Sequence, residues 1–402
     1  MLKQPRHIFG IELKITLANI TLVANTFVWY AIILAFLQNS LSDSALLFWV
    51  WSLHFLGIIF SGLVGVFLAR KLDQTRFLII WLILGSMSSL TLIVVNGSFT
   101  MPIIFLAILL GISLGLGMPT CMRYYTESIP IEKRGRISGI VMFAFGVGTI
   151  ALSTVPFDAL MLGVVLTVWR FSSLIIFLLL KPSNQIEQKR NNSSYRGILS
   201  HQAFILYFIP WVVFSLVNYI GAPVQSTLFG EQLTAQFTLI QNGLMGIFAI
   251  AGGILLDSIG RKRIAIAGFV MLGLGTAALG IYPESQVFWY FSAIVDGIGW
   301  GFLFVLFVLT IWGDLSYNLP SDKYYALGML PFFVSKFLEL TVGKYVSGVI
   351  PDYALFSFTA FFLFLAVLPL VYAPETLPEK HIKDRELKNY IEKAKREREK
   401  YA

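Results

Sequence analysis

The sequence has few charged residues, one cysteine and four histidines. Charged residues make up 13% of its 402 residues, whereas they make up about a quarter of a soluble domain. The single cysteine excludes a disulfide framework and a cysteine-based zinc cluster. The scattered histidines offer no paired or Ser–His–Asp arrangement, and the sequence contains no Gly-x-x-x-x-Gly-Lys-[Ser/Thr] nucleotide loop. We therefore expect no enzyme, no metal site and no cofactor.

Long apolar runs dominate the rest of the chain. Hydrophobic residues make up 57% of it and the mean hydropathy is +0.77. A helix needs about 20 mostly apolar residues to cross a bilayer. Runs of this kind predict an all-α membrane protein with twelve transmembrane helices near 15–38, 44–69, 77–96, 101–122, 137–157, 159–180, 203–229, 235–256, 264–282, 286–313, 325–350 and 353–373.

The basic residues orient these helices. All but three of the 30 Lys and Arg residues lie in segments 1–14, 70–76, 123–136, 181–202, 257–263, 314–324 and 374–402. The charged residues of the alternate loops are all acidic, and loops rich in basic residues stay in the cytoplasm. We therefore expect a multi-pass protein of the cell (plasma) membrane with both termini in the cytoplasm. The net charge of +8 follows from this topology, so it predicts contact with membrane lipids and no nucleic acid.

The chain is predicted to repeat itself. Equivalent helix positions hold four pairs at a nearly constant offset: Asp73 with Asp257, Gly111 with Gly297, Gly115 with Gly301, and Glu127 with Asp314. We expect an N-terminal six-helix half (1–180), a cytoplasmic linker (181–202), a C-terminal six-helix half (203–373) and a charged cytoplasmic tail (374–402). Parallel six-helix repeats are typical of transporters, which hold the substrate between the halves.

Two charged strings join helices at the cytoplasmic side. One runs from Gly253 through Asp257 and Gly260 to Arg261 and Lys262, and a degraded copy retains Asp73 with Arg76 in place of the second glycine. The other is Glu127-Ser-Ile-Pro-Ile-Glu-Lys-Arg134-Gly-Arg136. An acid at a helix end can cap a neighbouring helix and pair with nearby basic residues. These residues could also do no more than set topology.

The strings resemble signatures of the major facilitator superfamily. The first is similar to its G-x-x-x-D-x-x-G-R-K motif. The second, with Pro374-Glu375-Thr376, resembles its sugar-porter-like branch, although the paired glutamines of the sugar site and the Gly-Pro pair of drug antiporters are missing. The resemblance implies alternating access and a cytoplasmic gate of inter-helix ion pairs made by Asp73, Arg76, Glu127, Arg134, Arg136, Gly253, Asp257, Gly260, Arg261 and Asp314.

Charged residues inside helices are the strongest candidates for a substrate or proton site. Each costs roughly 2.5–3.5 kcal/mol on insertion scales. Lys336 and Glu339 share one helix face, and Asp296 lies on the preceding helix. We expect the three to form a cluster, which could be a transport site or a structural ion pair.

Further candidates for the substrate site come from single polar or aromatic side chains. Arg170 is a buried cation that could contact an anion or pair within its own half, and Lys344 lies where it can extend to the membrane surface. The resemblance implies that helices 1, 2, 7 and 8 line the cavity, where each polar group could instead join two helices. The remaining candidates are Asn25, His54, Asn218, Gln225, Gln241 and Trp300.

These patterns predict a secondary active transporter. We expect a monomer that moves a sugar, a carboxylate or another small organic ion by alternating access, with proton coupling through Asp296 or Glu339 as a hypothesis. Two alternatives remain: a drug or metabolite efflux antiporter, and a transporter-like membrane sensor or receptor.

Overall fold

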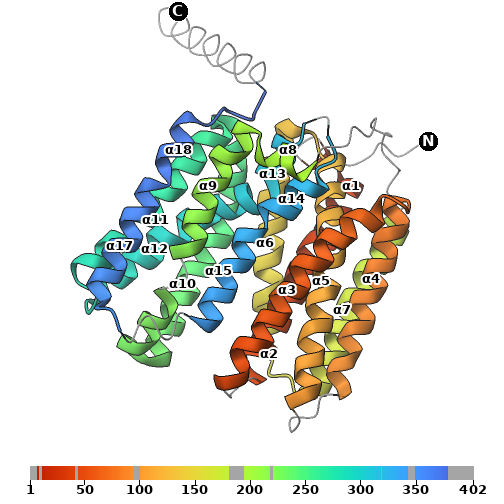
Figure 1. Ribbon diagram of the computed structural model, residues 1–402, viewed down its shortest axis with the longest axis horizontal. Helices are drawn as coiled ribbons and strands as arrows, with labels where there is room; N and C mark the ends of the chain where they lie inside the picture. The colour runs from red at the N-terminus through yellow and green to blue at the C-terminus, as the bar shows by residue number, and fades with distance from the viewer. Residues whose placement is uncertain are drawn as a thin grey trace, which may run out of the picture.

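The protein is a bundle of long helices that lie roughly side by side (Figure 1). This computed structural model describes residues 7–8, 11–40, 44–94, 100–180, 194–217, 221–317, 319–342 and 349–378. Within these ranges, ten helices are long and apolar enough to cross a membrane. The expected linker, as far as residue 193, and the expected tail beyond residue 378 fall outside the described ranges.

The first part of the chain supplies six long helical segments. They are α1–η1–α2 (Leu13–Asn19, Ile20–Ala24 and Asn25–Ser40), α3 (Ser44–Ala69), α4 with η2 (Gln74–Leu90 and Thr91–Val94), α5 (Thr100–Ser128), η3 with α6 (Ile131–Lys133 and Arg134–Ser153) and α7 (Ala159–Leu180). A short antiparallel pair, β1 (His7–Ile8) and β2 (Ile11–Glu12), precedes them. The predicted second and sixth helices agree with α3 and α7 at both ends.

The second part is more interrupted. It contains α8 (Tyr195–Leu199), α9 (Gln202–Val217), α10 (Gly221–Ile259), α11 (Arg261–Ile281), α12–η5–α13 (Gln286–Phe304, Val305–Thr310 and Ile311–Leu315), α14 (Asp322–Gly328), α15 (Leu330–Thr341), α17 (Asp352–Leu365) and α18 (Val367–Tyr372). The segments η1 and η5 are π-helical turns.

The predicted seventh helix, 203–229, contains α9 as far as Val217 and the start of α10 from Gly221, while residues 218–220 lie outside the described part of the chain. Gly230, with φ of +70°, interrupts α10 in the gap expected between the seventh and eighth helices. The eleventh, expected at 325–350, is divided into α14 and α15 near Pro331, because proline has no N–H group to continue the helical hydrogen bonds. The two predicted helices that are not among the ten both include residues outside the described ranges, at 218–220 and 343–348.

The helices of the two sequence halves lie on different sides of the bundle (Figure 1). Contacts across the middle are made by α6 with α10 and by α3 with α14 and α15. The glycine pairs that suggested a repeat occupy equivalent places. Gly111 and Gly115 of α5 pack against the backbone of α3, and Gly297 and Gly301 of α12 pack against the backbone of α10.

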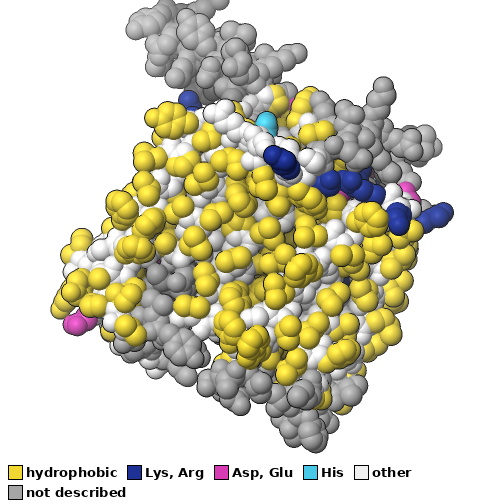
Figure 2. Space-filling view, in the orientation of Figure 1, with side chains coloured by type: hydrophobic (Ala, Val, Ile, Leu, Met, Phe, Trp, Pro, Cys, Tyr) yellow, Lys and Arg dark blue, Asp and Glu magenta, His cyan; other side chains and the backbone are white. Residues whose placement is uncertain are grey.

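The surface fits a bilayer. Figure 2 shows apolar side chains over most of the face in view, with Lys and Arg gathered along one edge. We call this edge the basic end; it holds Arg70, Lys71 and Arg76, where α3 ends and α4 begins. Helices α1 and α18, near the two ends of the described chain, lie on the same side of the bundle as this edge (Figure 1).

Candidate functional site

A central cavity of about 510 Å³ lies between the two groups of helices. Side chains of α2 and α6 form one wall, and those of α9 to α12, α15 and α17 form the other, together with η5 and Met329. Aromatic rings cover much of both walls: Phe27, Phe145, Phe214, Trp289, Trp300, Phe304, Phe332 and Phe356. Trp300 packs against Phe214 and Phe304 with ring centroids 4.8 Å apart in each case.

The charged side chains of the cavity form one ion pair and one separate acid. Lys336 Nζ donates to Glu339 Oε2 at 2.7 Å, and the two side chains are 35% and 26% exposed. Asp296 Oδ2 accepts a hydrogen bond from Ser292 at 3.1 Å, while its Oδ1 is buried without a hydrogen-bond partner. Among the described residues, no ion pair within 4.0 Å joins Asp296 to Lys336. The expected three-residue cluster is therefore a pair and a lone acid in one cavity.

The two walls differ in polarity. The predicted Gln241 lies in the cavity with Asn242, Thr238 and Thr276 on the second-half wall. The first-half wall contributes Phe27, Ala31, Leu34, Met142 and Phe145, and its one polar side chain among the described residues is Tyr30. Asn242 and Tyr30 were not among the sequence candidates, because a single amide or an aromatic residue in an apolar helix is an ordinary feature of membrane proteins.

Arg170 does not line this cavity. Its side chain is fully buried in α7 and donates a hydrogen bond to Thr26. The guanidinium carbon lies 5.1 Å from the Trp29 ring centroid and 4.3 Å from that of Trp81. Cation–π contacts of this kind stabilise a desolvated cation. The position fits the interpretation of Arg170 as a buried partner within its own half rather than as a substrate ligand.

Asn25 and His54 also lie outside the cavity. Asn25 Nδ2 donates to the Trp169 carbonyl oxygen at 2.8 Å and so joins α2 to α7. His54 is fully buried in α3 behind Tyr30, whose hydroxyl lies 3.2 Å from His54 Nε2. Asn218, Lys344 and the Gln225 side chain are outside the described part of the chain.

A buried ion-pair network closes the basic end. Asp314 accepts hydrogen bonds from Arg134 of α6 and, at 2.9 Å, from Arg261 Nε of α11. Asp257 is paired with Arg261 Nη1 at 3.0 Å. Its carboxylate also accepts from the backbone N–H groups of Gly135 and Arg136, each at 2.9 Å. Asp257 of α10 thus caps the first turn of α6, where a negative charge is favourable.

Three gate candidates have other partners. Asp73 is exposed and caps its own helix, α4, by accepting from the N–H groups of Thr75 and Arg76. The Arg76 side chain is exposed. Glu127 pairs with Arg123 Nε at 2.7 Å, four residues earlier on α5. The first-half copy of the motif therefore does not reproduce the contacts of the second.

Further contacts that close the basic end were not predicted from the sequence. Glu375, just after α18, accepts from the N–H groups of Arg261 and Lys262 at 2.8 and 3.2 Å and so caps α11. Gly260, with φ of +113°, makes the turn before this helix possible. Arg123 lies 4.0 Å from Asp322.

Nearby, burial lowers the pKa of Lys323. Its Nζ lies 4.9 Å from the centroid of the Tyr195 ring, whose hydroxyl pKa is raised by burial. These contacts join residues that are far apart in the sequence, so spacing alone could not reveal them.

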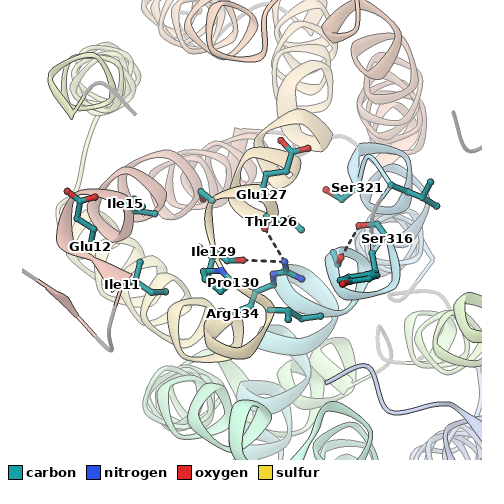
Figure 3. A pocket seen from close by; sticks show the side chains of 15 residues that line it. Ile11, Glu12, Ile15, Thr126, Glu127, Ile129, Pro130, Arg134, Ser316 and Ser321 are labelled. Atoms are coloured by element: carbon teal, nitrogen blue, oxygen red, sulfur yellow. Dashed lines mark hydrogen bonds between the residues drawn. The ribbon is translucent and has the colours of Figure 1, made fainter. Parts of the chain in front are cut away.

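A second hollow of about 450 Å³ opens at the basic end. Figure 3 shows Arg134 at its centre, where its Nη2 donates to the Thr126 and Ile129 carbonyl oxygens at 3.0 and 3.3 Å. The central cavity begins two turns away on the same helix, at Met142. Between the two hollows lie the Arg134–Asp314 pair and a 3.0 Å contact between the hydroxyls of Ser138 and Thr310. This layer separates the hollows; we call it the barrier.

Helices α6 and α10 diverge away from the basic end. On α6, a methyl group on Gly139 would meet the Ala249 carbonyl oxygen of α10 at 2.6 Å. Two turns further on, nothing lies within 4 Å of the corresponding position at Gly146, and the same is true of Gly243 on α10. The two helices are therefore in tight contact near the basic end and apart beside the cavity.

Comparison with known proteins identifies the family of this chain. A sequence profile of the Major Facilitator Superfamily matches residues 15–315. The chain belongs to the major facilitator superfamily. Its fold is that of this superfamily, and the protein is a membrane transporter rather than an enzyme. A search of curated proteins finds no match.

Solved structures of major facilitator transporters share the fold. The human organic anion transporter MFSD10 (TETRAN) is similar with a TM-score of 0.70 and 13% identity, over 89% of this chain and 99% of that chain. The proton:xylose symporter XylE has a TM-score of 0.69 and 16% identity, over 90% and 96%. The fucose:proton symporter FucP of E. coli has a TM-score of 0.67 and 15% identity, over 90% and 98%.

Proposed function

We propose that this superfamily member moves a small hydroxylated solute without net charge, such as a sugar or polyol, across the plasma membrane by alternating access. The observation that carries the proposal is the mixed lining of the central cavity. Aromatic rings such as Trp300 offer apolar faces, and Gln241 and Asn242 offer amide donors and acceptors. Ligand sites commonly combine an apolar lining with a few polar groups that fix orientation.

The charge of the cavity favours an uncharged solute over an anion. Arg170 lies outside it, and the charge of Lys336 is already opposed by Glu339 at 2.7 Å. Asp296 adds a further acidic group. A bound anion would therefore meet no unpaired basic group among the described lining residues. The charge balance argues against the carboxylate and organic-anion options.

The barrier supports a two-sided cycle. We assign the basic end to the cytoplasm, because loops rich in Lys and Arg remain on that side. The cavity would then be closed toward the cytoplasm by Arg134 and Asp314. Rocking of residues 1–180 against residues 203–373 would part these residues and join the cavity to the hollow of Figure 3.

A binding panel tests the solute class. The purified chain is heated with monosaccharides, polyols, small carboxylates, amino acids and hydrophobic cations, since a ligand at 100 times its Kd adds about 2.7 kcal/mol of stability. We expect stabilisation by a sugar or polyol, loss of that effect in Lys336→Gln, and no loss in Asp73→Asn at the exposed basic end.

Flux in liposomes then separates the alternatives. A stabilising sugar should exchange across the bilayer with its labelled form. Stabilisation by hydrophobic cations alone would replace the proposal with a drug or metabolite efflux antiporter. Tight binding without exchange would indicate a membrane sensor.

A further inference from the structure

The buried imidazole of His54 joins the cavity wall to the helix behind it. His54 lies on α3, with no exposed surface. Its Nδ1 is 2.6 Å from the Ala107 carbonyl oxygen of α5, and its Nε2 is 3.2 Å from the Tyr30 hydroxyl of α2. Tyr30 in turn lines the central cavity. A buried polar side chain thus lies directly behind Tyr30, the one polar group of the first-half wall among the described residues.

The contact with Ala107 determines the tautomer. A carbonyl oxygen can only accept a hydrogen bond, so at 2.6 Å the proton of the ring must be on Nδ1. The other neighbours of the ring are aromatic: Trp51 and Phe55 on α3, with ring centroids 5.7 and 5.2 Å away. Among the described residues, no carboxylate lies within 4.0 Å of His54. An isolated imidazolium would be costly to bury here, so the ring is neutral.

The tautomer in turn directs the Tyr30 hydroxyl. A neutral imidazole with its proton on Nδ1 presents Nε2 as an acceptor. The Tyr30 O–H group must therefore donate to Nε2. A hydroxyl has a single proton, so the oxygen of Tyr30 retains only acceptor capacity for any further partner.

We infer that His54 is a positioning residue that sets the specificity of this wall. It holds the Tyr30 hydroxyl as an acceptor, so the solute group lying against Tyr30 must be a hydrogen-bond donor. A hydroxyl fits this requirement, whereas a carboxylate, ketone or ether oxygen does not. The inference rests on the proposed function, because it places the solute in the central cavity.

Two substitutions of His54 separate its two hydrogen bonds. His54→Asn places an amide N–H near the position of Nδ1 and removes the acceptor for Tyr30. His54→Gln places an amide oxygen near the position of Nε2 and removes the donor to Ala107. Tyr30→Phe removes the hydroxyl itself.

The probes are the best sugar of the binding panel and its monofluoro analogues, in which one hydroxyl at a time becomes an acceptor-only fluorine. Dissociation constants are measured for the parent and for each analogue. In the wild type, one position should lose about fivefold in affinity through its hydrogen bond to Tyr30. This penalty should disappear in Tyr30→Phe and in His54→Asn and persist in His54→Gln. A purely structural His54 would alter stability without changing the ratio between parent and analogue.

The outcomes distinguish this inference from the proposed function. A sugar that binds with the same fluorine penalties in wild type, Tyr30→Phe and His54→Asn overturns the inference and leaves the function intact. Nitrogen NMR of the imidazoles gives a test that needs no ligand, with the His54 signal assigned by its loss in His54→Asn. A neutral ring protonated on Nδ1 supports the inference; a ring protonated on Nε2, or an imidazolium, overturns it.

Discussion

Individual charged residues divide into those that hold the bundle together and those that face the cavity. Arg170 belongs to the first group, because it is fully buried between Trp29 and Trp81. Asp296, Lys336 and Glu339 belong to the second. The cost of placing any charge in a membrane helix marks all four as unusual, but only their positions in space show which of them a solute can reach.

Replacing Arg170 should reduce stability without weakening solute binding. Arg170→Gln removes two cation–π contacts, each worth about 2 kcal/mol when desolvated. Arg170→Lys retains the charge but loses the flat guanidinium that stacks on the rings. We expect a lower Tm for both variants, with the larger decrease for Arg170→Gln. The Kd for the transported solute should be unchanged. Normal stability combined with a loss of solute binding would indicate instead that Arg170 contacts the substrate.

Asp296 is the residue on which proton coupling should depend. One of its oxygens is buried without a hydrogen-bond partner, and a carboxyl group in that setting is more easily buried when it carries a proton. Asp296→Asn should abolish solute accumulation driven by an imposed pH gradient and leave solute exchange at equal pH. Glu339→Gln is the companion variant. Gradient-driven accumulation that persists in both variants would end the hypothesis.

The sequence identified charged residues more readily than their partners. Lys336 and Glu339 could be paired from their helical spacing. The contact of Asp314 with Arg134 could not be derived from spacing, because it joins elements that are distant in sequence. Tyr30 was missed because an aromatic residue in an apolar helix is an ordinary feature, and its contact with His54 joins two different helices.

Among the elements, the pair α6 and α10 shows how helix faces determine where the molecule can open. Small residues at Gly139 and Gly253 allow the two backbones to touch near the basic end, as small residues do at many membrane helix interfaces. The same helices are separate at Gly146 and Gly243. Glycines in one helix therefore serve contact at one end and lie beside open space at the other.

A methyl group added to α6 should distinguish these two regions. Gly139→Ala would meet the Ala249 carbonyl oxygen at 2.6 Å and push α10 away. Gly146→Ala meets nothing within 4 Å and should gain up to about 1 kcal/mol in helix stability. Opening of the basic end is measured by maleimide labelling of a cysteine placed at the cavity floor, Met142→Cys. The native cysteine is removed by Cys121→Ser, and the maleimide is added from the basic side. Labelling should rise with Gly139→Ala and stay low with Gly146→Ala; equal labelling would refute the contact.

Helix positions were predicted well where a helix is continuous and poorly where it breaks. The limits of α3 and α7 followed from apolar length. The interruption at Gly230 falls between the predicted helices 203–229 and 235–256, whereas the division near Pro331 was hidden inside a continuous apolar run. Hydropathy measures the affinity of a segment for lipid, and it does not report a local change of backbone direction.

At the scale of the whole molecule, the barrier is the part that would have to change in the proposed alternating-access cycle. Arg134 and Asp314 belong to different halves, and Arg261 stabilises the same carboxylate from within the second half. A buried charge left without its partner costs about 3–5 kcal/mol. The closed basic end is thus held by these ion pairs together with the close contact of α6 and α10.

Asp314→Asn should shift the population toward molecules open at the basic end. It removes the only carboxylate that pairs with Arg134 among the described residues. The free energy of the closed state is therefore raised more than that of the open state. Labelling of Met142→Cys from the basic side should increase about tenfold, which corresponds to 1.4 kcal/mol. Asp73→Asn is the matched control, because Asp73 is exposed and caps only α4. Unchanged labelling with Asp314→Asn would show that the barrier does not depend on this pair.

The contact of Glu375 with the start of α11 determines how far the protein can be shortened. Its carboxylate accepts from Arg261 and Lys262, and the neighbouring Thr376 hydroxyl lies 3.3 Å from Asp314. A purification tag joined after Leu377 leaves these bonds in place. A chain cut before Glu375 exposes the first amides of α11 and loosens Asp314, so it should behave as a gating variant as well as a shorter protein.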